Sequence, residues 1–318
     1  MTDLIPEFSW ETVFLTPWRE DVDLTIWIVA TGFLVTTACG LIGHYLLLRR
    51  LALVGDAISH SILPGLVAAF AITGTTALWA SMLGALVAGL VTVALIELIH
   101  RHSRIKPDAA ICIVFTTLFA LGVAMMSVLE AQGSIHLDAD CVLYGEMTWV
   151  AIEPPLQIGG WTPVEMPGPV LRLLLLVGVL VAGIAFFYKE LLLTSFDPGL
   201  ARALGMRTQA WHYGLMGGLA LVVVSVFESV GAILPVAMLI VPPMFAAELS
   251  DRLSIRMVWT VVHAAAAAVL GMHLAVWLNC TAAGAMVVCS SALFVLVWVG
   301  GLAVRRLRLR RVMRGGGA

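Results

Sequence analysis

The chain has 318 residues, of which 61% are hydrophobic and 12% are charged, and its mean hydropathy is +1.01. Soluble domains carry about a quarter charged residues, so this composition excludes a soluble enzyme or nucleic-acid-binding domain and indicates a polytopic membrane protein. The net charge of −2 is uninformative, because the distribution of charges along the chain matters more than their sum.

The chain begins with an acidic segment, residues 1–23, which lacks the apolar stretch of a signal peptide and has its first basic residue at Arg19. We expect this segment to be extracytoplasmic. From there on, apolar windows predict an all-α membrane protein with about nine transmembrane helices. Their approximate ranges are 24–48, 51–72, 75–99, 109–129, 169–189, 209–228, 230–249, 256–277 and 280–304.

The basic residues set the orientation of these spans. If the N-terminus is outside, 16 of the 18 Lys and Arg residues fall in cytoplasmic segments, and only Arg19 and Arg172 fall outside. One missed helix would exchange the sides of every later loop, so this asymmetry predicts an odd number of spans and a cytoplasmic C-terminus. The transmembrane domain then covers residues 24–304, and residues 305–318 form a basic cytoplasmic tail.

Asp56 and His60 lie four residues apart in the second predicted span, on one face of the helix. Ionisable groups at membrane depth are costly and are a functional hypothesis by default. A carboxylate with an imidazole suits Mn(II), Fe(II) or Zn(II) and argues against Cu(I). We expect Pro64 and Gly65 to interrupt the helix nearby, as in the broken helices of transporters. The competing interpretation is an internal salt bridge or helix-to-helix hydrogen bond.

The third predicted span carries small residues four apart, at Ala80, Gly84 and Ala88. This spacing lines one helix face with small side chains and lets a neighbouring helix approach closely. We therefore expect a tight helix crossing on this face.

The loop at residues 130–168 is long, acidic and, in this orientation, extracytoplasmic. It forms either a solvated rim that obeys the orientation rule or an electronegative vestibule that concentrates cations or docks a partner. The loop also contains Cys141, one of five cysteines, which form no disulfide framework and no Cys-x-x-Cys motif. The roles of the loop and of Cys141 stay open.

Residues 195–206 follow the fifth predicted span on the cytoplasmic side and have the pattern of a short helix. Asp197 can cap it, Pro198 suits its first position, and Gly205 can adopt the left-handed terminus. The segment is either a helical turn on the membrane surface or a knob that fits the groove of a soluble partner. The residues of this candidate contact are Ser195, Phe196, Asp197, Pro198, Leu200, Ala201, Arg202, Leu204 and Gly205.

Glu228 lies near the outer end of the sixth predicted span. It either caps that span or faces the same cavity as Asp56 and His60, as a third metal ligand or an outer gate. The neutral candidates within the spans are interpreted as packing or interface histidines: His44, His263 and His273.

The chain has no nucleotide-hydrolysis motif. Its two lysines, Lys106 and Lys189, precede Pro107 and Glu190, so no Gly-x-x-x-x-Gly-Lys-[Ser/Thr] loop is present. No His-Glu-x-x-His or Gly-x-Ser-x-Gly motif occurs either, so we predict that the chain is not an enzyme.

Four blocks, at residues 53–65, 108–122, 195–205 and 230–243, read LVGDAISHSILPG, DAAICIVFTTLFALG, SFDPGLARALG and VGAILPVAMLIVPP. Together they resemble the membrane subunits of manganese, zinc and iron ABC importers, the ABC-3 permease family. The resemblance runs from about residue 30 to 255 and is more specific than any single motif.

This resemblance implies a permease subunit of an ATP-driven importer of Mn²⁺, Zn²⁺ or Fe²⁺ in the bacterial inner membrane, with no permanently bound cofactor. By the same resemblance, Asp56 and His60 match the family's metal-coordinating pair, and the 195–206 segment matches its coupling helix. The implied partners are a cytoplasmic ABC ATPase dimer, a second permease subunit, an extracytoplasmic metal-binding protein and the lipid bilayer.

The main alternative is a self-sufficient, proton-coupled secondary metal transporter, in which Asp56, His60 and Glu228 form a proton relay. A permease for a metal chelate is a further alternative. It needs a wide aromatic or Arg-lined cavity, which the predicted spans do not offer. The sequence leaves open which metal is carried, whether two identical or two homologous permeases pair, and which binding protein delivers the metal.

Overall fold

The structure is a computed structural model. It describes residues 6, 8–75, 77–131, 147, 150, 153, 166–231 and 234–315. The side chains of residues 78, 228, 234, 304, 305 and 307–315 lie outside this description.

All regular elements within the described residues are helical, which confirms the predicted all-α class. They are, in chain order, η1 (Glu11–Leu15), α1 (Val22–Leu48), α2 (Ala52–Thr73), α3 (Leu78–His102), α4 (Pro107–Ala131), α7 (Gly168–Phe186), α8 (Tyr188–Phe196), α9 (Pro198–Ala203), α10 (Thr208–Val230), α11 (Leu234–Leu249), α12 (Leu253–Leu278) and α13 (Ala282–Gly315).

Helices occupy all nine predicted span ranges, but they are not equal in length. Eight of those described are long and apolar enough to cross a membrane. The exception is α11, which has 16 residues and contains Pro242 and Pro243. A full span needs about 20 residues, so α11 is short for one. The count of nine spans and their orientation stay predictions.

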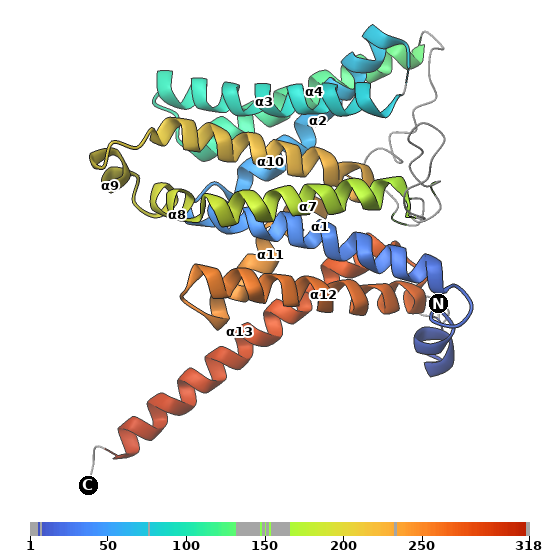
Figure 1. Cartoon of the computed structure of the whole chain (residues 1–318), viewed down its shortest axis with the longest axis vertical. Coiled ribbons are helices and arrows are strands. Elements are labelled where there is room, and N and C mark those ends of the chain that lie inside the picture. Colours follow the sequence, from blue (N-terminus) through green and yellow to red (C-terminus); the bar gives the residue numbers. More distant parts are fainter. Residues whose placement is uncertain are drawn as a thin grey trace.

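Figure 1 shows the long helices packed alongside one another, with the N-terminus at one end of the bundle and α9 at the other. The C-terminus lies toward the same end as α9, because α13 leaves the bundle in that direction. An odd number of membrane crossings requires the two termini of the chain to lie at opposite ends of the bundle. The residues of the predicted basic tail continue α13 as far as Gly315 instead of forming a separate segment.

The centre of the bundle is α1. Its residues 34–46 are all buried, and Tyr45 and Ile42 are among the largest side chains with almost no exposed surface. A helix that is hydrophobic on every side is a core helix, because it has no polar face to turn toward water. Around it pack α7, α10, α11 and α12, and the turn at its C-terminal end leads directly into α2.

The helix α2 crosses α3 at two glycines. A Cβ atom on Gly65 would collide with the carbonyl oxygen of Gly84, and a Cβ atom on Gly84 would collide with that of Gly65. The absence of both side chains lets the two backbones touch. The predicted close-packing face around Gly84 is therefore confirmed.

The other neighbours of α2 also approach through glycine. A Cβ atom on Gly122 of α4 would lie 2.8 Å from Pro64 Cδ, and one on Gly55 would lie 2.5 Å from Leu239 Cδ1 of α11. The helix that carries Asp56 and His60 is thus held by α3, α4 and α11.

The reciprocal crossing makes a testable prediction for Gly84→Val. The new side chain has no space against Gly65, and overpacking of this kind costs about 1–3 kcal/mol. We expect a lower melting temperature for the purified protein in detergent. The matched control is Gly178→Val in α7, where a Cβ atom would meet nothing within 4 Å. Equal melting temperatures for the two variants would contradict the tight crossing.

Candidate functional site

Asp56 and His60 lie together in the first half of α2. The distance from His60 Nε2 to Asp56 Oδ1 is 3.3 Å, so the two groups form the i, i+4 pair that their spacing predicts. The side chain of His60 is 25% exposed and that of Asp56 is 32% exposed. The pair therefore remains accessible from one side of the chain.

Two aromatic rings of α4 fix the imidazole of His60. The ring centroid of Phe115 lies 5.8 Å from that of His60, and the centroid of Phe119 lies 5.7 Å away with its plane at 80°. Both rings pack close to the imidazole. The ring is thereby held with its Nε2 atom directed at Asp56.

The predicted interruption of α2 at Pro64 is wrong, because the helix runs without a break from Ala52 to Thr73 with Pro64 inside it. Packing explains the continuity, since Gly122 of α4 and Gly84 of α3 support the helix on both sides of the proline. A proline has no N–H group, so the carbonyl of His60 loses its usual intrahelical donor. This leaves a further oxygen acceptor at the position of the candidate site.

The described part of the chain does not complete a metal site by itself. No group of three or more His, Cys, Asp or Glu side chains able to hold an ion occurs among the described residues. Asp56 and His60 supply a carboxylate and an imidazole, a ligand set that suits Mn, Fe and Zn but is short of a full coordination shell.

Several candidates fall outside the described part of the structure. The backbone of Glu228 lies in α10, but its side chain is outside the description, so its role as a ligand or gate stays a prediction. Cys141 and most of the acidic loop at 130–168 also lie outside the described residues.

The three other intramembrane histidines have packing partners, as predicted. His44 Nε2 lies 2.8 Å from Thr260 Oγ1, and His263 Nε2 lies 2.8 Å from Ser290 Oγ. His273 Nδ1 lies 2.9 Å from the carbonyl oxygen of Val13, so it ties the N-terminal segment to α12. All three are buried, unlike His60.

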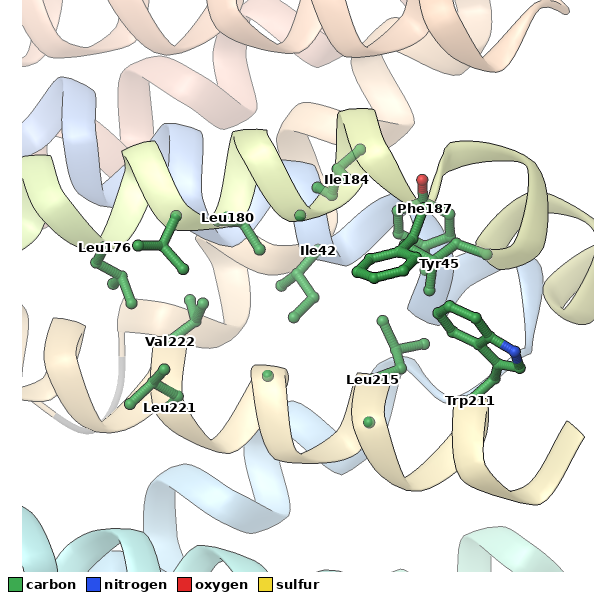
Figure 2. A pocket seen from close by; sticks show the side chains of 15 residues that line it. Ile42, Tyr45, Leu176, Leu180, Ile184, Phe187, Trp211, Leu215, Leu221 and Val222 are labelled. Carbon is green, nitrogen blue, oxygen red and sulfur yellow. The ribbon is translucent and has the colours of Figure 1, made fainter. Parts of the chain in front are cut away.

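A cavity of about 320 Å³ lies between α1, α7 and α10 (Figure 2). The side chains around it are apolar or aromatic, and Phe187 and Trp211 close one end with ring centroids 5.2 Å apart. Its lining includes no carboxylate and no imidazole. A dication would find no ligand there, so this cavity is not the metal site.

After α7, the helix α8 leads into the short helix α9 with the predicted caps. The side chain of Asp197 accepts hydrogen bonds from the N–H groups of Gly199 at 3.0 Å and Leu200 at 2.9 Å. Pro198 is the first helical residue, and Gly205 has a φ of 81°. The sequence thus predicted both ends of this helix from local chemistry.

The helix α9 lies at one end of the bundle (Figure 1). The segment around it carries exposed apolar side chains. Phe196 is 78% exposed, Leu204 is 64% exposed and Leu200 is 48% exposed, whereas Ala201 is buried. Exposed apolar side chains grouped on one small element are typical of a protein contact.

The sequence interpretation missed a polar cluster beside α9. Arg49 and Glu97, assigned only to a cytoplasmic loop and a span, contact His212 at 3.3 Å and 3.6 Å. The only local signal was the spacing of Glu97 and Arg101, which predicts an i, i+4 ion pair.

This chain is similar to membrane proteins of known metal transport systems. The family model described as the ABC 3 transport family matches residues 21–300. The manganese transport system membrane protein MntD of Bacillus subtilis (strain 168) is 42% identical over 287 residues, which cover 89% of this chain and 95% of that protein. The zinc transport system membrane protein TroD of Treponema pallidum (strain Nichols) is 35% identical over 276 residues, covering 87% and 74%.

A solved structure is also similar. PsaBC from Streptococcus pneumoniae, in complex with Fab, superimposes with a TM-score of 0.73 at 30% identity, over 90% of this chain and 94% of that chain.

The cap of α9 makes a prediction that does not depend on any partner. Asp197→Ala removes the acceptor of two N–H groups, and the loss of an N-cap costs about 1 kcal/mol. We expect amide hydrogen exchange in a peptide covering residues 195–206 to become roughly fivefold faster. Asp197→Asn is the control, because its side-chain oxygen can still cap. Unchanged exchange in Asp197→Ala would show that the cap does not hold α9.

Proposed function

The chain belongs to the ABC 3 transport family, and from this premise we propose that it is the transmembrane permease subunit of an ATP-driven importer of divalent transition metals, Mn²⁺, Zn²⁺ or Fe²⁺. It is a multi-pass protein of the bacterial inner membrane. The metal is its cargo.

The observation that carries this proposal is the partial exposure of an incomplete ligand set. Asp56 and His60 lie in an apolar helix, yet a quarter to a third of each side chain is exposed. Charged groups at membrane depth face a bundle interior, a water-filled cavity or a partner chain. We place them at the seam with a second permease subunit, which completes the coordination shell and encloses the metal path between the two subunits.

The pair suits a transport site better than a storage site. Conduction requires a site that binds well enough to admit the ion and weakly enough to release it. Two ligands from this chain give such a site, because the ion leaves when the two subunits separate. An extracytoplasmic binding protein delivers the metal to the acidic outer face, where negative charge concentrates cations.

Energy enters through partner subunits. The chain has no P-loop, so ATP hydrolysis belongs to a cytoplasmic ATPase dimer. The exposed residues Phe196, Leu200 and Leu204 fit an apolar groove on that ATPase, and residues 195–206 act as the coupling helix. The chain is therefore a transport subunit and not an enzyme.

The decisive experiment is metal uptake by proteoliposomes that contain the full complex. Removal of a residue that only hydrogen-bonds to a metal ligand costs about 10–100-fold in metal affinity or activity. Removal of a direct ligand should cost at least as much. We therefore expect Asp56→Ala and His60→Ala each to reduce ⁵⁴Mn or ⁶⁵Zn uptake at least about tenfold. The uptake of the double variant should be only slightly lower than that of either single variant, because both substitutions destroy the same site. Full uptake by the double variant would remove these residues from the metal path.

Two controls make this experiment specific. Asp251→Ala and His100→Ala change an exposed carboxylate and an exposed imidazole elsewhere in the chain and should leave uptake near the wild-type rate. Proteoliposomes with this chain alone, under a pH gradient and without ATP, should take up no metal. Uptake under those conditions would instead favour the proton-coupled carrier.

A further inference from the structure

The side chain of Arg49, which follows α1, contacts residues of α8 and α10. Arg49 Nε donates to Ser195 Oγ at 2.9 Å, and Nη2 donates to Thr194 Oγ1 at 3.2 Å. Nη1 lies 3.3 Å from His212 Nδ1 at the start of α10. The guanidinium thus contacts the last turn of α8 and the second turn of α10 at the same time.

The contacts continue to α3. His212 Nε2 lies 3.6 Å from Glu97 Oε2, and Glu97 Oε1 lies 2.5 Å from Arg101 Nε. The cluster therefore joins α8, the end of α1, α10 and α3 through one continuous set of polar side chains.

The hydrogen-bonding partners of Thr194 determine which groups donate and which accept in this cluster. Thr194 donates its hydroxyl proton to the carbonyl oxygen of Glu190 at 2.8 Å, so it is free only to accept from Arg49. Both Thr194 and Ser195 are buried, with 4% and 5% of their surface exposed. Partial burial lowers the pKa of Arg49 from its ordinary value, but an arginine stays charged throughout the physiological range. Charge-assisted hydrogen bonds of this kind are stronger than neutral ones.

Arg49 also belongs to the turn that starts α2. Leu51 N–H donates to the carbonyl oxygen of Leu46 at 2.9 Å, and Arg50 has a φ of 58°, which closes the turn tightly. The helix α2 begins at Ala52. At 1.5 Å per residue, Asp56 lies about 6 Å and His60 about 12 Å along the helix axis from its first residue. A displacement of the turn therefore reaches the candidate metal site through one rigid helix.

We propose that Arg49 is the positioning residue that transmits movement of the coupling helix to the metal site. This inference rests on the proposed function, in which the ATPase moves residues 195–206. Thr194 and Ser195 directly precede that segment's exposed side chains, and their hydroxyl groups hold the guanidinium. When α9 moves, Arg49 carries the turn and the start of α2 with it, and Asp56 and His60 shift relative to the partner subunit.

The planar guanidinium is essential to this role. Its N–H groups point in fixed directions and reach three acceptors on two helices, whereas a lysine has one flexible charged group. We therefore expect Arg49→Lys to fail almost as fully as Arg49→Gln, although it preserves the charge. A residue that served only to balance charge would be replaced by lysine without loss.

The test measures metal uptake and ATP hydrolysis in the same proteoliposomes, with the ATPase and the binding protein present. For Arg49→Lys and Arg49→Gln, we expect the number of ⁵⁴Mn ions taken up per ATP to fall about fivefold or more, which is the lower end of ordinary coupling between sites. ATP hydrolysis and equilibrium ⁵⁴Mn binding by the resting complex should stay near wild type, because neither the ATPase nor the metal ligands have changed.

The matched control is Arg50→Gln. Arg50 is the next residue and is exposed, and its substitution by Gln removes the same charge. Among the described residues, its side chain has no hydrogen-bond or ion-pair partner. Its uptake per ATP should match wild type. An equal loss in Arg50→Gln would show that net charge at the turn is responsible and would overturn the proposal.

A second variant approaches the same contact from α8. Thr194→Val combined with Ser195→Ala removes both hydroxyl acceptors while Arg49 remains, and it should reproduce the loss of uptake per ATP. Adding Arg49→Gln to it should deepen the loss little, because the contact is already gone. This variant decides the question if the Arg49 variants do not assemble.

Three outcomes would overturn the inference while the proposed function stands. They are wild-type uptake per ATP in the Arg49 variants, wild-type uptake per ATP in the Thr194 and Ser195 variant, and an equal loss of uptake per ATP in Arg50→Gln. The absence of ATP-dependent uptake in the wild-type complex would instead overturn the proposed function, and this inference with it.

Discussion

The structure depends on one constraint, the absence of water in the hydrocarbon core of the bilayer. Each backbone N–H and C=O group there must find its partner within the protein, and a helix provides that partner locally. Some buried polar side chains also find a partner within the protein, although Tyr45 OH, Ser61 Oγ and His263 Nδ1 have no hydrogen-bond partner among the described residues. The imidazoles of His44 and His263 contact the hydroxyl groups of Thr260 and Ser290, each at 2.8 Å. These histidines are explained by packing alone and need no role in transport.

Asp56 and His60 satisfy the constraint differently. They contact each other at 3.3 Å, but both keep exposed surface where the packing histidines keep almost none. An internal salt bridge that served only to join helices would lie between two helices and be covered by both. This pair lies within one helix, so it joins nothing. Its geometry leaves lone pairs of the carboxylate and one side of the imidazole available to an ion or to a neighbouring chain.

The sequence was sufficient wherever the determining chemistry is local. Helix ranges follow from runs of apolar residues, and both ends of α9 follow from Asp197, Pro198 and Gly205. The sequence was insufficient where contacts with distant segments determine the structure. Pro64 does not break α2, because glycines in two other helices pack against α2 at this point, and no local pattern around Pro64 shows this. The contacts of Arg49 were missed because its partners lie about 150 residues away, and a basic residue beside a span is ordinarily only a topological signal. The short length of α11 was also not predicted.

The two ends of α2 are held in different ways, and this difference gives the helix a direction of movement. Its outer half is fixed to α3 where Gly65 meets Gly84, a contact of two backbones that has no room to slide. Its other end is joined to α1 through the hydrogen-bonded turn at Arg49 and packs against α11 where Gly55 meets Leu239. In the coupling proposed above, a rigid helix displaced at this turn would pivot about the glycine crossing. Asp56 lies about 14 Å from Gly65 along the axis and His60 about 8 Å, so Asp56 travels nearly twice as far. The pair would keep its own geometry during such a rotation, while its distance to ligands on the proposed second permease subunit would change. A metal site shared across a seam can open in this way without unfolding any part of the helix that carries it.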